Sequence, residues 1–189
     1  MSDIEGTPSF HEALKTVFNS FLGEEINTCL PGIVDSYDNT KQKATITPAI
    51  SKKFLDGEVL SYKPIENVPV LFPGSTSTSI TYPIVKGDIV LLIFSQRAME
   101  NFLDKGEIVE PGDRRKFDIT DAIAIPGFMT FNKDSKSTNN EDLEIYHEGA
   151  FIAIKKNKDI ALQNDNCILI MNNQSGQLDI NNGNLTVES

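Results

Sequence analysis

The sequence predicts a mainly β protein with an N-terminal α-helix, a small barrel and a C-terminal repetitive β-segment. Three observations predict this order: an apolar stripe with helical spacing, a central series of short β-type runs, and regularly spaced apolar pairs in the last third. We expect an N-terminal helix in residues 1–27 and a barrel in residues 28–131. A polar linker over 132–142 then separates the barrel from the repetitive segment, 143–189.

The N-terminal segment has the pattern of an amphipathic helix over residues 9–26. Ser9 and Glu12 form a capping-box pattern, and Pro8 blocks extension of the helix backwards. Apolar residues recur every three or four positions and so share one helical face. We expect this face to pack on the chain's own domain, with a neighbouring subunit as the alternative. Its residues are Phe10, Leu14, Val17, Phe18, Phe21 and Leu22.

From Ile33 to Ile125 the pattern changes to short β-strands. The run 89–94 is apolar at both alternating positions, so we expect a central strand covered on both faces. The run 68–73 is framed by prolines, which places it at an edge or next to a bulge. About five strands in roughly a hundred residues favour a closed barrel of the OB kind, with a small SH3-like barrel as the alternative.

The last third of the chain carries apolar pairs separated by polar turns. Within each pair a single residue intervenes, so both side chains fall on one face of a short strand. Strands this short need further copies as neighbours before they can close a core. We therefore expect an intertwined or stacked β assembly with a structural role. The pairs are Leu143 with Ile145, Ile152 with Ile154, Ile160 with Leu162, Ile168 with Ile170, Leu178 with Ile180, and Leu185 with Val187.

Composition argues against several classes of function. The net charge is −10, and no basic stripe is present to contact phosphates, so we expect no nucleic-acid partner. Cys29 and Cys167 are far apart in the sequence, which argues against a disulfide framework or a thiolate metal site. No early apolar run resembles a signal peptide, and no stretch is long and apolar enough to span a bilayer. We therefore expect the chain to be assembled in a cytoplasm.

The search for a catalytic or metal centre is negative. His11 and His147 each stand without a second ligand at metal-binding spacing. Neither a glycine-rich phosphate loop nor a nucleophile elbow is present. We expect the basic run 114–116 to pair with Asp113 and Asp118 of its own loop rather than with an acidic partner. The expectation is a protein that is not an enzyme, with no catalytic residue, no metal and no cofactor.

The middle of the chain resembles the N-terminal OB domain of central spike proteins from contractile phage tail baseplates. The resemblance covers about residues 28–130 and depends on an ordered set of stretches more than on any single one. Of these, the ending Asp121–Gly127 is the most specific. The stretches are Pro31–Val34 with Tyr37 and Asp38, Thr45–Ala49, Val68–Gly74, Pro83–Arg97 and Arg115–Gly127.

This resemblance implies a homotrimer in the tail baseplate of a virion. Three OB domains would form a collar beneath a baseplate hub protein. Three C-terminal segments would wind into an intertwined, triangular β-helix needle, which sheath contraction drives into the host cell envelope. All residues of the six apolar pairs would then face the threefold axis as the trimer core. A charge placed at Ile160 or Ile168 should accordingly abolish assembly.

Two features of such spikes have no counterpart in this sequence. The short linker 132–142 leaves no room for the lysozyme domain that some members carry. No histidine follows His147, so the iron-binding tip of other members is missing, and we expect a separate tip protein or a longer natural chain. The alternatives are an OB module that binds nucleic acid or glycan, which the near-neutral barrel disfavours, and an envelope-degrading enzyme, for which no residues of a pocket with catalytic acids or a metal can be named.

Overall fold

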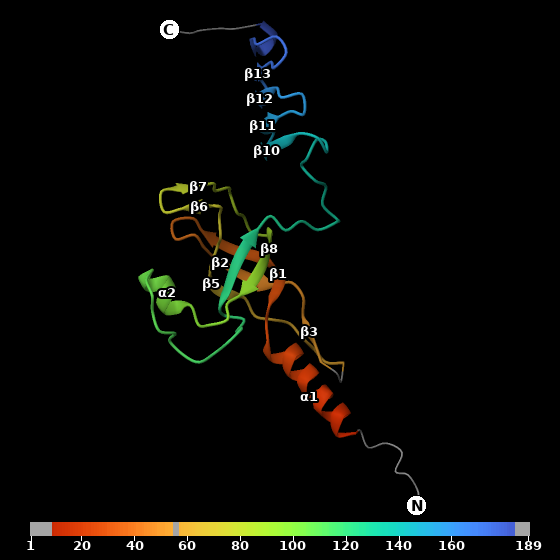
Figure 1. Cartoon of the computed structure of the whole chain (residues 1–189), viewed down its shortest axis with the longest axis vertical. Coiled ribbons are helices and arrows are strands. Elements are labelled where there is room, and N and C mark those ends of the chain that lie inside the picture. The colour runs from red at the N-terminus through yellow and green to blue at the C-terminus, as the bar shows by residue number, and fades with distance from the viewer. Residues whose placement is uncertain (1–8, 55–56, 184–189) are drawn as a thin grey trace, which may run out of the picture. The chain divides into compact units, whose positions relative to one another are not determined.

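Strands predominate in the computed structural model, which describes residues 9–54 and 57–183 (Figure 1). Helices are few in these ranges, so the prediction of a mainly β protein is confirmed. The chain divides into two units, Met1–Thr130 and Phe131–Ser189. This division separates neither the N-terminal helix from the barrel nor the linker from the β-segment, and the four segment bounds stay a prediction.

Helix α1 spans Phe10–Glu25 and begins at the capping box that the sequence indicates. Ser9 N donates to Glu12 Oε2 at 2.8 Å, and Glu12 N donates to Ser9 Oγ at 3.3 Å. These bonds satisfy backbone donors that a helix start leaves without partners. The backbone hydrogen bond from Ser9, followed by the bond with its side chain, lowers the pKa of the Glu12 carboxyl.

The apolar face of α1 is not covered by the chain's own domain. All six of its apolar side chains are exposed, from 43 % for Leu14 to 84 % for Phe10. The expectation that this face packs on its own domain is therefore wrong. The helix is followed at once by β1, and the connection is fixed at Asn27, whose backbone N and side-chain Nδ2 donate to Phe117 O at 3.2 and 2.8 Å.

Unit 1 is built on a five-stranded antiparallel sheet that forms a half-barrel. Val70, just after β5, forms a parallel bridge with Ala124 of β9, and Leu71 N donates to Ala124 O at 2.8 Å. The two edge strands of the sheet are thereby linked. In order across the sheet the strands are β5 (Ile65–Pro69), β2 (Lys43–Pro48), β1 (Cys29–Asp38), β8 (Ile89–Phe94) and β9 (Ala122–Pro126).

The core of unit 1 lies on the inner face of this sheet. In β8, buried residues alternate with partly exposed ones, as in a strand with one well-covered face. The second face is less covered than the apolar run predicts, because Ile89, Leu91 and Ile93 are only partly buried. The buried residues are Val34, Ala44, Ile46, Ile65, Val68, Val70, Phe72, Ile84, Val90, Leu92, Phe94, Ala122 and Ala124.

Short elements lie in the connections of unit 1. β3 (Lys52–Lys53) pairs with β4 (Val59–Leu60), and β6 (Gly74–Ser75) pairs with β7 (Thr78–Ser79). Helix α2 (Glu100–Lys105) lies between β8 and β9. It ends at Gly106, whose φ of 66° is in the left-handed region that glycine adopts without strain.

Unit 2 contains a second five-stranded sheet, an antiparallel meander whose strands pair in chain order. Five of the six predicted apolar pairs lie on these strands, whereas the sixth pair, Leu185 and Val187, lies outside the described residues. The strands are β10 (Leu143–His147), β11 (Ala150–Ile154), β12 (Ile160–Gln163), β13 (Ile168–Met171) and β14 (Leu178–Ile180), followed by the 3-10 turn η1 (Asn181–Gly183).

The pairing within unit 2 differs from the intertwined arrangement that we expected. Each described strand forms its hydrogen bonds with neighbouring strands of the same chain. The reason is that the polar turns are short enough to reverse the chain after every strand, which favours a meander over a crossing to another chain. The backbone is therefore satisfied within one polypeptide, while the side chains of one sheet face remain uncovered.

Replacing Gly32 by alanine should destabilise unit 1. A Cβ at this position would lie 2.6 Å from Ile46 Cγ2 and 3.0 Å from Leu92 Cδ1, and both side chains are fully buried. Overpacking of this kind lowers the free energy of unfolding by about 1–3 kcal/mol. Urea unfolding of the full chain, followed by tyrosine fluorescence, measures the loss. Gly23→Ala is the control, because nothing lies within 4 Å of that Cβ; equal stability of both variants would contradict the prediction.

Candidate assembly face

The strand register of unit 2 gathers apolar side chains on one face of the sheet. Residues that pair across an antiparallel sheet point to the same face, so the register can be followed from strand to strand. This gives two rows that cross all five strands, and together they are called the apolar face. One row is Leu143, Ile154, Ile160, Met171 and Leu178; the other is Ile145, Ile152, Leu162, Leu169 and Ile180.

No residue of the apolar face is buried in the single chain. Eight of the ten are exposed, from 38 % for Ile160 to 61 % for Leu143, while Leu169 and Ile180 are partly buried. Monomeric proteins rarely leave a contiguous apolar surface of this kind in water. The apolar face is therefore a candidate for assembly.

The opposite face of the sheet has a different composition. Ala153 and Ala161 are paired at its centre and are almost fully buried, at 2 % and 1 % exposed. Their row is completed by Glu144 on one side and by Ile170 and Asp179 on the other. The second row of this face is Tyr146, Phe151, Gln163 and Ile168, so the face that lies away from the apolar one is mixed, with small, charged, aromatic and aliphatic side chains.

The expectation that every predicted pair shares one face does not hold for Ile168 and Ile170. In the register, Ile168 pairs with Gln163 and Ile170 with Ala161, so both lie opposite the apolar face. Leu169 and Met171 lie on the apolar face instead of Ile168 and Ile170. The physical reason is the loop 164–167, whose four residues are an even number. When the residues on either side of a loop pair with each other, an even number of loop residues places even-numbered positions of one strand on the same face as odd-numbered positions of the next.

The sequence contains a signal for this exchange that the pair pattern missed. Residues 168–171 are Ile-Leu-Ile-Met, which is apolar at both parities, so either pair suits an apolar face. Only the length of the loop decides between them. The assignment of the other predicted residues to a trimer core stays a prediction. For the last pair, Leu185 and Val187, no register can be given, because both residues lie outside the described part of the chain.

A buried carboxylate connects two turns that lie at the same end of neighbouring strands in this sheet. Asp159 is 8 % exposed and lies just before β12. Its Oδ1 accepts a hydrogen bond from Asn173 N at 2.8 Å, and its Oδ2 accepts one from Asn157 Nδ2 at 2.9 Å. The turn before β12 is thereby joined to the turn after β13, which fixes the register that the apolar face requires.

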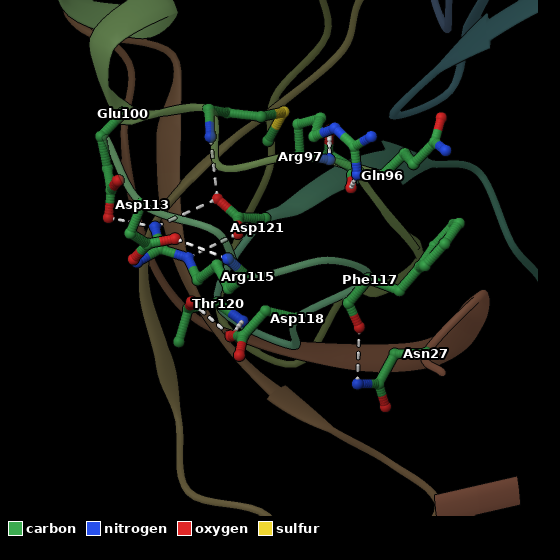
Figure 2. Close-up of polar contacts among 12 residues, drawn as sticks. Asn27, Gln96, Arg97, Glu100, Asp113, Arg115, Phe117, Asp118, Thr120 and Asp121 are labelled. Atoms are coloured by element: carbon green, nitrogen blue, oxygen red, sulfur yellow. Dashed lines mark hydrogen bonds and ion pairs between the residues drawn. The ribbon is translucent and has the colours of Figure 1, made fainter. Parts of the chain in front are cut away.

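Unit 1 contains a charged cluster centred on Arg115 (Figure 2). Arg115 Nε donates to Asp121 Oδ2 at 2.7 Å, and Nη1 donates to Asp113 Oδ2 at 2.7 Å. Its Nη2 pairs with Glu100 of α2. Asp121 is 3 % exposed and also accepts a hydrogen bond from Met99 N at 3.0 Å. The hydrogen bonds to Asp121 and Glu100 raise the pKa of Arg115 above its ordinary value.

This cluster has a structural role, because each guanidinium nitrogen of Arg115 is bonded to a carboxylate of its own chain. It holds the connection between β8 and β9, including α2, against the start of β9. The expected pair with Asp113 is confirmed. The guanidinium makes no direct bond to Asp118. It contacts Glu100, which is distant from the basic run in the sequence, and Asp121, which follows the run by several residues.

The described part of the chain offers no metal cluster: no three His, Cys, Asp or Glu side chains are placed there to hold an ion. No helix in the same ranges is long and apolar enough to cross a membrane. His147, at the end of β10, is exposed. That the protein is not an enzyme stays a prediction.

A half-barrel unit followed by a sheet with an uncovered apolar face is the architecture of a structural protein that assembles. Comparison with protein families is consistent with this class. Residues 30–127, just over half of the chain, match the family described as the phage protein Gp138 N-terminal domain. The chain belongs to this family. It is thus a phage structural protein of the tail or baseplate type and a component of the virion. A search of curated proteins found no match to the chain.

Replacing Arg115 by alanine should destabilise unit 1, because it leaves the buried Asp121 charge without its partner. Loss of one member of a buried ion pair lowers the free energy of unfolding by roughly 3 kcal/mol. Arg114→Ala is the matched control, since Arg114 is exposed and such changes stay within about 0.5 kcal/mol. Urea midpoints that shift equally for both variants would show that the cluster is not needed for stability.

Proposed function

We propose that this chain is the central spike of a contractile phage tail baseplate, a homotrimer that helps to penetrate the host cell envelope. The observation that supports this most is the apolar face, which follows a barrel in the same chain and has no cover within it. The role implies a hub protein that holds the barrels, a separate tip protein at the far end and contact with the host envelope.

The half-barrel supports an OB-type collar. Its strand order, β5-β2-β1-β8-β9, with a parallel contact between the two edge strands, suits a small, partly open barrel of this kind. The core of unit 1 is complete within one chain, so three such barrels need only surface contacts to form a collar. Membership of a phage protein family over the same residues is consistent with this proposal.

Assembly through the apolar face is energetically sufficient. Full burial of a large apolar side chain contributes about 1.5–3 kcal/mol, and the exposed members of this face are about half exposed. Ten residues therefore contribute roughly 8–15 kcal/mol per chain, or roughly 25–45 kcal/mol for three chains. Two association steps cost roughly 4–15 kcal/mol each. The gain exceeds the cost in the middle of these ranges.

In the proposed needle each chain supplies one side of a three-sided rod. The meander satisfies its backbone within the chain, and the apolar faces of three sheets meet at a common axis. Glu144 and Asp179, on the opposite face, then lie on the side of the sheet away from the axis. A rod of this kind is stiff enough to transmit the force of sheath contraction, whereas a flexible chain is not.

The full-length chain should be a trimer in solution. Light scattering coupled to size-exclusion chromatography should give three times the chain mass of 20.9 kDa. Two sheets that face each other would also cover the apolar face. A measured mass of two chains would therefore contradict the trimeric spike and indicate a sandwich-type dimer. A stable monomer would remove the proposed function altogether.

Charges on the apolar face should prevent assembly, whereas a charge on the opposite face should not. Ile160→Asp and Leu169→Asp place three unpaired carboxylates at the proposed axis, a cost of several kcal/mol per charge. Both should give monomers by light scattering and lose resistance to detergent. Ile168→Asp is the matched control: it is adjacent to Leu169 and also partly buried, but lies on the other face. A trimer of Leu169→Asp would contradict the register, and loss of the trimer in Ile168→Asp would restore the original pair assignment.

A further inference from the structure

We infer that α1 packs against the α1 helices of the other two copies, as a parallel three-helix bundle about the threefold axis. This inference rests on the proposed trimer and adds a second interface to it. The occupant of the apolar face of α1 is thus another copy of this chain. A hub protein seated on the same face is the outcome that would overturn it.

The described part of the chain leaves the apolar face of this helix exposed. Between Phe10 and Gly23 no side chain is buried, and Phe10, Val17 and Phe18 are exposed at 84 %, 65 % and 58 %. Its capping box stabilises the first turn, but its last turn has no basic residue. Isolated helices of about this length are marginal in water. Continued helicity up to β1 therefore requires contacts made by this face.

The spacing of the face is that of a helix that pairs with its own kind. Phe10, Leu14, Val17 and Phe21 are separated by four, three and four residues, which is the alternation of core positions in a coiled coil. Phe18 and Leu22 widen this seam. The seam ends at Phe21, because the next core position is Glu24.

Over its first three turns, the charges of the helix are compatible with a parallel bundle of identical chains. In such a bundle every residue faces its own copies, so like charges beside the seam would repel. The flanking positions of the first three turns are His11, Ala13, Phe18 and Ser20, none of which is acidic or a lysine or arginine. Glu12 and Lys15 lie on the outer positions.

The connection to the barrel would hold the three helices at one level. Asn27 follows α1 closely, and its side-chain Nδ2 donates to Phe117 O (Figure 2). Its backbone N donates to the same oxygen. In a trimer of barrels, three such joints surround one axis. Helices tethered this closely meet at an effective concentration on the order of millimolar, so even weak packing suffices to join them.

Disulfide cross-linking in the full-length chain tests the bundle. Cys29 and Cys167 are exposed free thiols and are first replaced by serine. Leu14→Cys then places a thiol on the seam, and Lys15→Cys places one on the outer side of the same turn. A disulfide requires Cα atoms within about 7 Å, so only the seam position meets this condition. Oxidation should give at least roughly fivefold more covalent dimer for Leu14→Cys, up to about two thirds of the chains.

A second pair of variants tests whether the apolar seam causes the contact. In the Leu14→Cys background, Val17→Asp should abolish the cross-link, whereas Asn19→Asp adds the same charge on the outer side and should leave it. Equal cross-linking in these two variants would contradict the inference that the apolar seam causes the contact between the helices. Light scattering of each protein accompanies the oxidation, because it separates this inference from the proposed function.

The possible outcomes are distinct. A trimer that cross-links at Leu14→Cys and not at Lys15→Cys supports the bundle. A trimer without a Leu14→Cys cross-link overturns the bundle and leaves the proposed spike intact, with the α1 face free for a hub protein. A chain that is monomeric or dimeric overturns the threefold bundle together with the proposed trimer.

Discussion

The two units depend on one constraint: an antiparallel sheet has two faces, and loop length decides which side chains share one. In unit 2 the turns bring ten large apolar side chains to the same face, and no layer covers them within residues 9–54 and 57–183. In unit 1 the sheet curves and encloses its own apolar residues instead. The same rule thus yields a core that is complete in one chain and a surface that is not.

The difference between the units extends to their stability. Unit 1 buries a cluster of aliphatic and aromatic residues and holds its longest connection through Arg115 and Asp121. In the described part of unit 2, the buried apolar residues are Ala153 and Ala161 alone. A sheet with so little buried apolar area gains most of its stability when its uncovered face is packed. Folding of unit 2 is therefore coupled to assembly in the proposed spike, whereas folding of the half-barrel of unit 1 is not.

Much of this architecture was accessible from the sequence, and the failures have physical causes. The capping box at Ser9 and the strands carrying the apolar pairs were predicted, because both depend on local pattern. The exchange of Ile168 and Ile170 for Leu169 and Met171 depends on the parity of loop 164–167, which composition does not reveal. The exposed face of α1 was assigned to the wrong partner, since a pattern shows that a face needs cover but not what provides it. The Asp121–Arg115–Glu100 cluster joins residues that only the folded loop brings together.

The meander of unit 2 has a consequence for how such a rod would form and come apart. Because each chain closes its own ladder of hydrogen bonds, three sheets can come together laterally as they fold, and no chain has to wind around another. The chains of such a rod would therefore not be intertwined, and no entanglement would oppose their dissociation. Its resistance to mechanical load would come from the free-energy cost of exposing all three apolar faces to water at once when the chains separate. The fewest contacts must break at the two ends of the rod, so separation would begin there.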